Sequence, residues 1–425
     1  MTASVHATEH LLFAVLLQLI VIIAVARIGN ALFQRMGQPG AVGEIVAGLL
    51  LGPSLFGHLA PGAATALFGA KPDPVVSILS QIGLVLLMFQ IGCGFAFERL
   101  DARRVQRLAL AVAIPSVVVP FGLGLAIGRF SAGTLAPEID PLTYSLFCGV
   151  ALAITAVPIL GRILVEHRLE RTEIGVVAIA AAAVNDVTGW LLLAFVSAYA
   201  TAHLSGAGIA WQLGGLLLFV AALRFMLAPV VDRLLARMPL VEGNLPPNLL
   251  ATILCLIFAL ALCTYALGIF AIFGGFAAGL LFHRHHAVAA AWQKQVGQFV
   301  LTFFLPIFFT FTGLRTNLLG LGAADLPWLV LILAAAILGK IVPVALAARA
   351  AGLETRPALT LGTLMNTRAL MELIVLNVGY ELGFLPQSMF TMLVVMAVAT
   401  TLMTGPLLRL LLAPAHHGAR LRVDA

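Results

Sequence analysis

Apolar stretches of about 20 residues recur along the whole chain, and they restrict its fold more than any other feature of the sequence. A stretch of this length and composition is typical of a transmembrane helix. Hydrophobic residues make up 61% of the sequence and charged residues 10%, whereas soluble domains carry about 25% charged residues. The sequence therefore predicts an all-α integral membrane protein.

Breaks at glycine, proline and charged clusters divide the chain into thirteen predicted transmembrane helices. A split at Gly268 separates the eighth helix from the ninth, and without that split the count is twelve. The predicted segments are 10–33, 41–59, 75–97, 107–129, 143–166, 172–201, 209–236, 248–266, 268–283, 297–315, 327–350, 357–380 and 388–412. Together they form a single membrane transport domain over residues 1–425, and no soluble regulatory domain is expected.

Arginine and lysine gather in alternate connections between these segments, as expected of cytoplasmic loops. The connection after the third segment, for example, carries Arg99, Arg103, Arg104 and Arg107. This alternation predicts an N-terminus outside the cell and a cytoplasmic C-terminus, in the inner (plasma) membrane. The net charge of +6 then follows from the orientation in the lipid bilayer, so no binding to nucleic acid is expected.

An odd helix between two groups of six forces the two groups into opposite orientations, which is the inverted-repeat plan of many secondary transporters. The predicted repeats cover residues 10–201 and 248–412, and residues 209–236 form the linker helix. A faint echo agrees with this plan: residues 43–50 read GEIVAGLL, and residues 274–281 read GGFAAGLL.

Five charged residues lie inside predicted helices rather than in loops: Glu44, Asp186, Lys340, Arg368 and Glu372. An Asp, Lys or Arg at the centre of a membrane helix costs about 2.5–3.5 kcal/mol on insertion scales, so such residues usually line an ion path or pair with each other. We therefore expect them to include the functional site.

Asp186 lies midway along the sixth segment among small residues. Burial favours the neutral form of a carboxyl group, so a proton and a metal ion compete for the same two oxygens. Competition of this kind predicts exchange of Na⁺ or K⁺ for H⁺ at Asp186, and the alternative is a structural ion pair between helices. Asn185 tunes the geometry of the ion site, caps a backbone break, or has a packing role.

Two predicted helices contain interruptions near their middle. In the fifth segment Pro158 removes a backbone donor, and Thr155 could add a hydroxyl oxygen to an ion site; the alternative is a simple kink, with Thr155 bonding its own helix. In the twelfth segment residues 362–368 (GTLMNTR) interrupt the apolar run at a comparable place. Two crossed broken helices are expected from the inverted plan.

The other charged residues inside predicted helices, and three histidines, each allow more than one role. Arg368 and Glu372 lie four residues apart on one helical face, which favours a structural or gating pair over a role as ion ligands. Lys340 either holds the ends of the broken helices, pairs with Asp186, or extends to the cytoplasmic rim. Glu44 is either a cytoplasmic funnel residue or an acid at the start of its helix. His283, His285 and His286 lie at a loop edge and favour a solvated face over a metal site.

At these residues the chain resembles the cation:proton antiporter-2 family, which includes Kef-type potassium systems and plant cation/proton exchangers. Five landmarks carry the resemblance in order. They are residues 43–54, 154–160, 183–187, 305–314 and 364–375.

The resemblance implies a thirteen-helix fold with inverted repeats, like that of Na⁺/H⁺ antiporters, and a homodimer in which a core domain moves against a dimerisation domain. It also implies that Asp186 carries ion and proton, that Asn185 takes the first place of a carboxylate pair found in electrogenic relatives, and that Lys340 matches their core lysine. With one titrating acid, we expect electroneutral exchange.

The sequence thus predicts a secondary-active transporter, not an enzyme, that works by alternating access without a cofactor. Two alternatives remain open at this point. One is a gated K⁺ efflux pathway, and the other is an ion sensor or small-solute exporter on the same scaffold.

Overall fold

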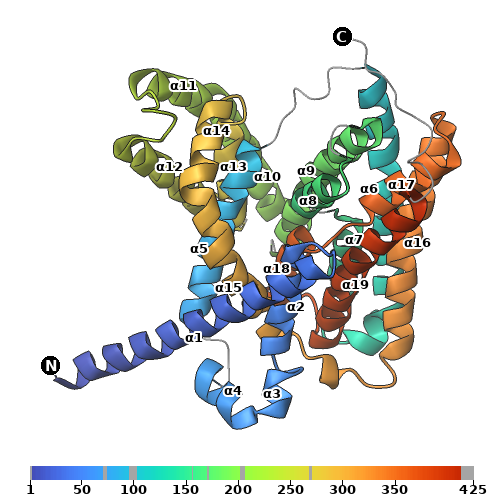
Figure 1. The fold of residues 1–425 in the computed structure, drawn as a ribbon, viewed down its shortest axis with the longest axis horizontal. Helices are drawn as coiled ribbons and strands as arrows, with labels where there is room; N and C mark the ends of the chain where they lie inside the picture. Colours follow the sequence, from blue (N-terminus) through green and yellow to red (C-terminus); the bar gives the residue numbers. More distant parts are fainter. Residues whose placement is uncertain are drawn as a thin grey trace. The chain divides into compact units, whose positions relative to one another are not determined.

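This computed structural model describes residues 2–69, 74–94, 103–155, 157–169, 172–201, 206–267 and 270–412, and most of them lie in helices (Figure 1). In that part of the chain the β-structure is limited to one isolated bridge between Val241 and Asn244. Ten helices there are long and apolar enough to cross a membrane, and a bent pair, His286–Gly297 with Val300–Gly320, makes an eleventh if it is counted as one span. Two shorter apolar helices are Pro141–Ala153 and Ala271–Leu281.

Every one of the thirteen predicted segments contains helix, so the all-α membrane architecture is confirmed. The predicted split at Gly268 is also correct, because α12 (Pro247–Ala266) ends before Gly268 and α13 (Ala271–Leu281) begins after it. Gly268 itself lies outside the described residues, as do Arg99 and the tail from residue 413 onward. The predicted membrane orientation and the boundaries of the two repeats stay predictions.

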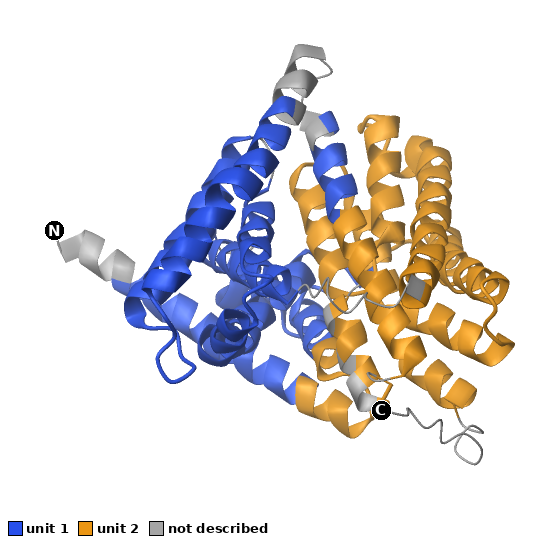
Figure 2. Ribbon diagram, turned by 90° about the horizontal axis from the view of Figure 1, so that it is seen from above, with its two compact units in different colours: residues 1–29, 44–97, 190–319 blue, residues 30–43, 98–189, 320–425 orange. Residues whose placement is uncertain are grey.

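The helices form two compact units, and each unit takes segments from both predicted repeats (Figure 2). Unit 1 comprises residues 1–29, 44–97 and 190–319, and unit 2 comprises residues 30–43, 98–189 and 320–425. The chain thus enters each unit several times.

Unit 1 is built on close contacts between backbones. Its helices are α1 (Thr2–Arg35, up to Gly29), α2 (Gly40–Leu51, from Glu44), α3 (Phe56–Leu59), α4 (Pro61–Phe68), α5 (Pro74–Cys93), α9 (Glu173–Thr201, from Trp190), α10 (Gly206–Ala222), η2 (Leu223–Leu227), α11 (Ala228–Arg237), α12, α13, α14 (His286–Trp292), η3 (Gln293–Gly297), η4 (Val300–Phe304), α15 (Leu305–Arg315) and η5 (Leu318–Gly320).

Two glycines that the sequence echo pairs occupy matching positions in unit 1. A side chain at Gly48 of α2 would overlap the backbone carbonyl of Phe309 in α15, and one at Gly279 of α13 would overlap that of Phe89 in α5. Only glycine permits such an approach between helices. The second predicted helix of each repeat therefore packs on the third predicted helix of the other, and the two contacts match each other.

Unit 2 holds both interrupted helices. Its helices are α6 (Arg103–Leu135), α7 (Pro141–Ala153), α8 (Val157–Glu166), α9 (Glu173–Thr201, up to Gly189), α16 (Leu326–Ala350), α17 (Thr355–Met365), α18 (Leu370–Glu381) and α19 (Gln387–Leu412). Helix α6 contains Gly124 and Gly128, where added side chains would overlap α7 at Cys148 and Ser145. This spacing of small residues lets α6 and α7 pack closely.

The two interruptions occur where the sequence predicts them. Helix α7 stops at Ala153, Ile154 is extended with φ −70° and ψ 144°, and α8 starts at Val157 with Pro158 in its first turn, where a missing N–H is tolerated. Helix α17 stops at Met365 and α18 starts at Leu370. The two breaks touch, because the Thr155 hydroxyl donates to the Met365 carbonyl at 3.1 Å.

Candidate cation-binding site

Asp186 lies in the half of α9 that belongs to unit 2, and its side chain is 1% exposed. Its two carboxylate oxygens are buried, and neither accepts a hydrogen bond of normal geometry from the described residues. They interact instead with the backbone N–H of Val157, at the start of α8, and with the ammonium group of Lys340. A buried carboxylate is normally hydrogen-bonded, so these oxygens are available to a ligand.

Asn185 precedes Asp186 on α9 and is fully buried. Its amide nitrogen donates to the hydroxyl of Ser116 in α6 at 2.7 Å and to that of Thr155 in the first break at 3.2 Å. Its amide oxygen has no hydrogen-bond partner in the described chain. Three unpaired buried oxygens therefore come from two consecutive residues.

Thr155 joins the two breaks. Its hydroxyl donates to Met365 and accepts from Asn185, so it does not bond a carbonyl of its own helix. The alternative of a simple kink at this position is therefore wrong. Thr155 lies between the end of α7 and the start of α8, where the backbone leaves helical geometry.

Lys340 of α16 is fully buried, so the alternative of a side chain that extends to the cytoplasmic rim is wrong. Its ammonium group donates to the carbonyl of Ser116 in α6 at 2.8 Å and, through a short contact, to the carbonyl of Ala153 at the end of α7. Both acceptors lack the usual helical donor four residues further on: Pro120 has no N–H, and Ala153 is the last residue of α7. Lys340 thus caps the broken end of α7.

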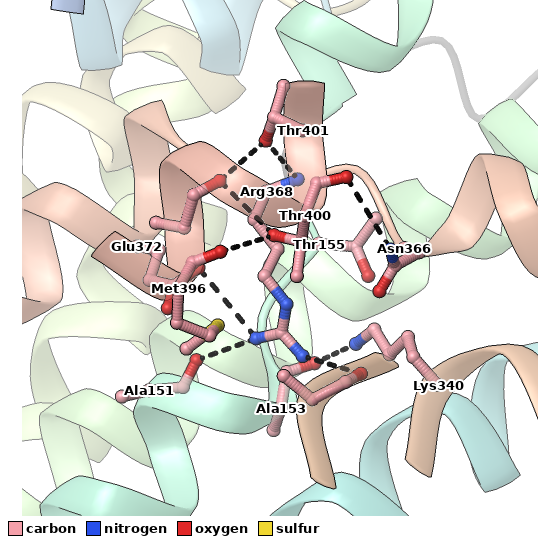
Figure 3. A network of polar contacts seen from close by, with 12 residues as sticks. Ala151, Ala153, Thr155, Lys340, Asn366, Arg368, Glu372, Met396, Thr400 and Thr401 are labelled. Carbon is pink, nitrogen blue, oxygen red and sulfur yellow. Dashed lines mark hydrogen bonds and ion pairs between the residues drawn. The ribbon is translucent and has the colours of Figure 1, made fainter. Parts of the chain in front are cut away.

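Arg368 lies in the second break and forms the centre of the polar network in Figure 3. Its guanidinium group donates to the carbonyl of Ala151 in α7 at 3.1 Å and to that of Ala336 in α16 at 3.5 Å. The same group is 3.7 Å from the Glu372 carboxylate, four residues later. The predicted pairing of Arg368 with Glu372 is therefore present in the structure, and both side chains are fully buried.

The second break also rests on threonines of α19. The backbone N–H of Arg368 donates to the Thr401 hydroxyl at 3.2 Å, and the Asn366 amide donates to the Thr400 carbonyl at 3.5 Å. Both threonine hydroxyls bond carbonyls within α19, at Ala397 and, for Thr400, also at Met396. Helix α19 thus holds the chain between α17 and α18 in place (Figure 3).

The buried charges of unit 2 balance. Asp186 and Glu372 supply two negative charges when ionised, and Lys340 and Arg368 supply two positive charges; Lys340 interacts electrostatically with all three others. Opposite charges within a few ångströms compensate part of the cost of burial. A proton or a monovalent cation on Asp186 would change the charge of this cluster by the same amount.

Comparison with known proteins gives the family. The family described as "Sodium/hydrogen exchanger, transmembrane" matches residues 20–413 of the chain. The chain belongs to the sodium/hydrogen exchanger family. This confirms the antiporter family that the sequence landmarks indicated, whose members are secondary transporters and not enzymes.

Several members of the sodium/hydrogen exchanger family are similar to the chain over nearly its whole length. It is 37% identical over 413 residues to the Na⁺/H⁺ antiporter NhaS4 of Synechocystis, covering 95% of this chain and 99% of that protein. It is 34% identical to the cation/H⁺ antiporter 18 of Arabidopsis thaliana, over 95% of this chain and 50% of that protein. It is 30% identical to the K⁺/H⁺ antiporter 1 of Saccharomyces cerevisiae, over 93% of this chain and 46% of that protein.

The fold of this exchanger-family chain matches that of the sodium proton antiporter MjNhaP1 from Methanocaldococcus jannaschii. The TM-score is 0.63 at 16% sequence identity, and the match covers 95% of this chain and 98% of the other. The predicted fold class, an all-α membrane protein with inverted repeats and broken helices, is thereby confirmed.

Ser116 is the site residue of this exchanger-family chain that sequence reasoning missed. A serine inside a helix usually bonds its own preceding turn, and Ser116 does so at Ala113. The signal in the sequence was Pro120, because a proline four residues after Ser116 leaves the Ser116 carbonyl without its helical donor.

Glu44 belongs to unit 1, so it is not among the residues that unit 2 brings together around Asp186. It is the fifth residue of α2, which begins at Gly40 and has no acid in its first turn, so the alternative of an acid at the helix start is wrong. Its carboxylate is 4% exposed and forms an ion pair with Arg27 of α1. The funnel role stays a prediction.

The three histidines also lie in unit 1. His285 bonds the Asp232 carboxylate at 2.9 Å, and a ring nitrogen of His283 lies 2.6 Å from the Leu280 carbonyl. No group of three or more His, Cys, Asp or Glu side chains suited to hold a metal occurs among the described residues.

Proposed function

We propose that this chain exchanges a monovalent cation, Na⁺ or K⁺, for H⁺ across a membrane by alternating access, and that Asp186 binds the cation and the proton in turn. The observation that carries this proposal is the pair of buried Asp186 oxygens, neither of which accepts a hydrogen bond of normal geometry from the described residues. An ionised carboxylate in such surroundings is costly unless a proton or a cation is bound. Either ligand satisfies the same oxygens, so they exclude each other.

The first break shapes the site for this exchange. The carbonyls of Ala151 and Ala153 at the end of α7 are occupied by Arg368 and Lys340. The start of α8 instead presents the Val157 N–H to Asp186. The positive end of this helix stabilises the Asp186 carboxylate while it holds neither a proton nor a cation. Asp186 can therefore release one ligand before it takes the next.

The charge balance of the cluster supports electroneutral exchange. Asp186 with a proton and Asp186 with Na⁺ or K⁺ leave the same net charge among the four ionisable side chains, so one ion replaces the other without net charge movement. The names of the relatives include Na⁺/H⁺, K⁺/H⁺ and cation/H⁺ antiporters, which supports antiport and leaves both cations within the proposal.

The proposal extends to assembly and placement. Unit 2 holds both broken helices and acts as the moving core, and unit 1 provides the dimerisation surface of a homodimer. The protein lies in the plasma membrane with its N-terminus outside and its C-terminus in the cytoplasm. The alternation of arginine-rich connections supports this orientation.

Proteoliposomes containing the purified protein test the proposal. An inward cation gradient should drive proton efflux through the native protein in a fixed ratio and without a membrane current. Asp186→Asn should abolish both fluxes, whereas Asp140→Asn, which changes an exposed acid in a loop, should leave them intact. Cation flux without proton flux would favour a channel, and an Asp186→Asn variant as active as the native protein would exclude this site.

A further inference from the structure

Ser116 makes more contacts with the proposed site than its position inside α6 requires. Its hydroxyl donates to the Ala113 carbonyl at 2.8 Å and accepts from the Asn185 amide nitrogen at 2.7 Å. Its own carbonyl accepts from Lys340 at 2.8 Å. One fully buried residue thus contacts both the neighbour of Asp186 in sequence and the lysine that interacts electrostatically with Asp186.

These contacts determine which way the Asn185 amide points. The Ser116 hydroxyl has one hydrogen, which it donates to Ala113, and the Thr155 hydroxyl donates its hydrogen to Met365. Both hydroxyls can therefore only accept from Asn185, so the group that faces them must be the NH₂ group and not the oxygen.

The amide oxygen must then point away from both hydroxyls, where it has no hydrogen-bond partner in the described residues. A buried amide oxygen without a donor is uncommon. It matches a need of the neighbouring carboxylate, because Na⁺ and K⁺ in transporters and channels are bound by oxygens and not by N–H groups.

We propose that Ser116 is a positioning residue for cation binding: with Thr155, it fixes the Asn185 amide so that the amide oxygen, and not the NH₂ group, is offered to the cation beside Asp186. The inference rests on the proposed function. A flipped amide would direct its hydrogens at the cation, so loss of the Ser116 hydroxyl should weaken cation binding. Proton binding to Asp186 does not require the amide oxygen and should be affected less.

Ser131 provides a matched control on the same helix. It is also fully buried in α6, and its hydroxyl contacts the Gly128 carbonyl at 3.4 Å and the Tyr144 hydroxyl at 2.9 Å. Ser116→Ala and Ser131→Ala each remove one buried hydroxyl from α6, but only the first removes an acceptor of Asn185. The Ser116 carbonyl remains in Ser116→Ala, so the contact with Lys340 is kept.

The experiment measures exchange in proteoliposomes as a function of cation concentration and of pH. Loss of one buried hydrogen bond corresponds to about a 3- to 10-fold change in affinity, so Ser116→Ala should raise KM for the cation by that factor while the maximal rate stays close to native. Ser116→Cys, which keeps the connectivity of the side chain, is slightly larger and accepts hydrogen bonds only weakly, should show the same shift. Ser131→Ala should keep the native KM.

A double-mutant cycle separates positioning from general loosening of the core. In an Asn185→Ala background, Ser116→Ala should raise KM no further, because the amide through which it acts is absent. An unchanged KM in both Ser116 variants, or a full additional rise in that background, would overturn the inference. If instead the native protein and Ser131→Ala show no cation-driven proton movement, the proposed function fails, which is a separate result.

Discussion

The two broken helices of unit 2 end in different ways. At the end of α7, Ile154 is extended, and the carbonyls of Ala151 and Ala153 accept from the charged side chains of Arg368 and Lys340. At the end of α17 the last carbonyls instead accept hydrogen bonds from the backbone N–H groups that follow them. The Asn366 N–H donates to Gly362 and Thr363, each at 3.2 Å, and the Thr367 N–H donates to Leu364 at 3.2 Å.

This difference shows that an inverted repeat can relate two breaks in position without making them alike in chemistry. The end of α7 depends on two charges from distant parts of the chain, and these charges also compensate the carboxylates near them. The end of α17 depends on its own backbone and on neutral hydroxyls of Thr155 and Thr401. We therefore expect substitutions to affect the two breaks by different amounts.

Removal of the lysine charge should have the largest effect. Lys340→Met leaves the carbonyls of Ser116 and Ala153 without their donor and Asp186 with less compensation. Removing one partner from a buried charge cluster typically costs about 3–5 kcal/mol, and chemical unfolding in detergent should show a loss of this order. Lys294→Met, which changes an exposed lysine bonded to Asn244, serves as the control and should change little. Equal small losses would show that α7 does not need Lys340.

A smaller effect of opposite sign is expected at the second break, where the backbone itself is strained. Ala369 is buried and has φ 94° and ψ −101°, a region that costs non-glycine residues about 1–3 kcal/mol. Ala369→Gly should therefore stabilise the protein by about 1 kcal/mol once the greater freedom of glycine in the unfolded chain is included. Ala358→Gly, within α17, should instead destabilise by about 1 kcal/mol. A loss of stability in both variants would contradict strain at Ala369.

The smallest effect is expected at the intact start of α7, and it depends on pH. The exposed Asp140 carboxylate accepts from the Thr143 N–H at 2.8 Å, and this bond holds the pKa of Asp140 below its usual range. The charged form is thus favoured by folding, so its contribution is present above about pH 4 and is lost as the pH falls through the lowered pKa. At pH 7, Asp140→Ala should cost about 0.5 kcal/mol, the low end of measured capping effects, because Asp140 is exposed.

The difference between native protein and Asp140→Ala should narrow when thermal unfolding is followed from pH 7 down to about pH 3. Asp140→Ser is the control, because its hydroxyl caps the helix without titrating in this range. A difference in stability between the native protein and Asp140→Ala that stays constant with pH would show that the Asp140 charge does not contribute to stability.

The sequence was informative wherever a local physical rule applies. Long apolar stretches predicted the helices, Pro158 and the polar residues before Arg368 predicted the breaks, and a spacing of four predicted the contact of Arg368 with Glu372. Each of these depends on residues that are near one another in the chain.

Contacts between distant parts of the chain could not be predicted in this way. The bond from Lys340 to Ala153 spans 187 residues. The sequence allowed three roles for Lys340, and only the packing of α16 against α6 and α7 decides between them. Glu44 had two readings, and neither included its partner Arg27 in the preceding helix. Thr401 looks like any other helix threonine until the second break is seen to lie against it.

Pro120, one of two prolines in α6, has a consequence for mutational scanning. The acceptor that Lys340 uses at Ser116 is a main-chain atom, so no side-chain replacement at position 116 deletes it. Position 120 controls it instead: an alanine there would restore an amide hydrogen that reclaims the carbonyl for the helix. A scan that scores each position by its own side chain would thus detect the contact between Lys340 and the Ser116 carbonyl at position 120 and not at position 116.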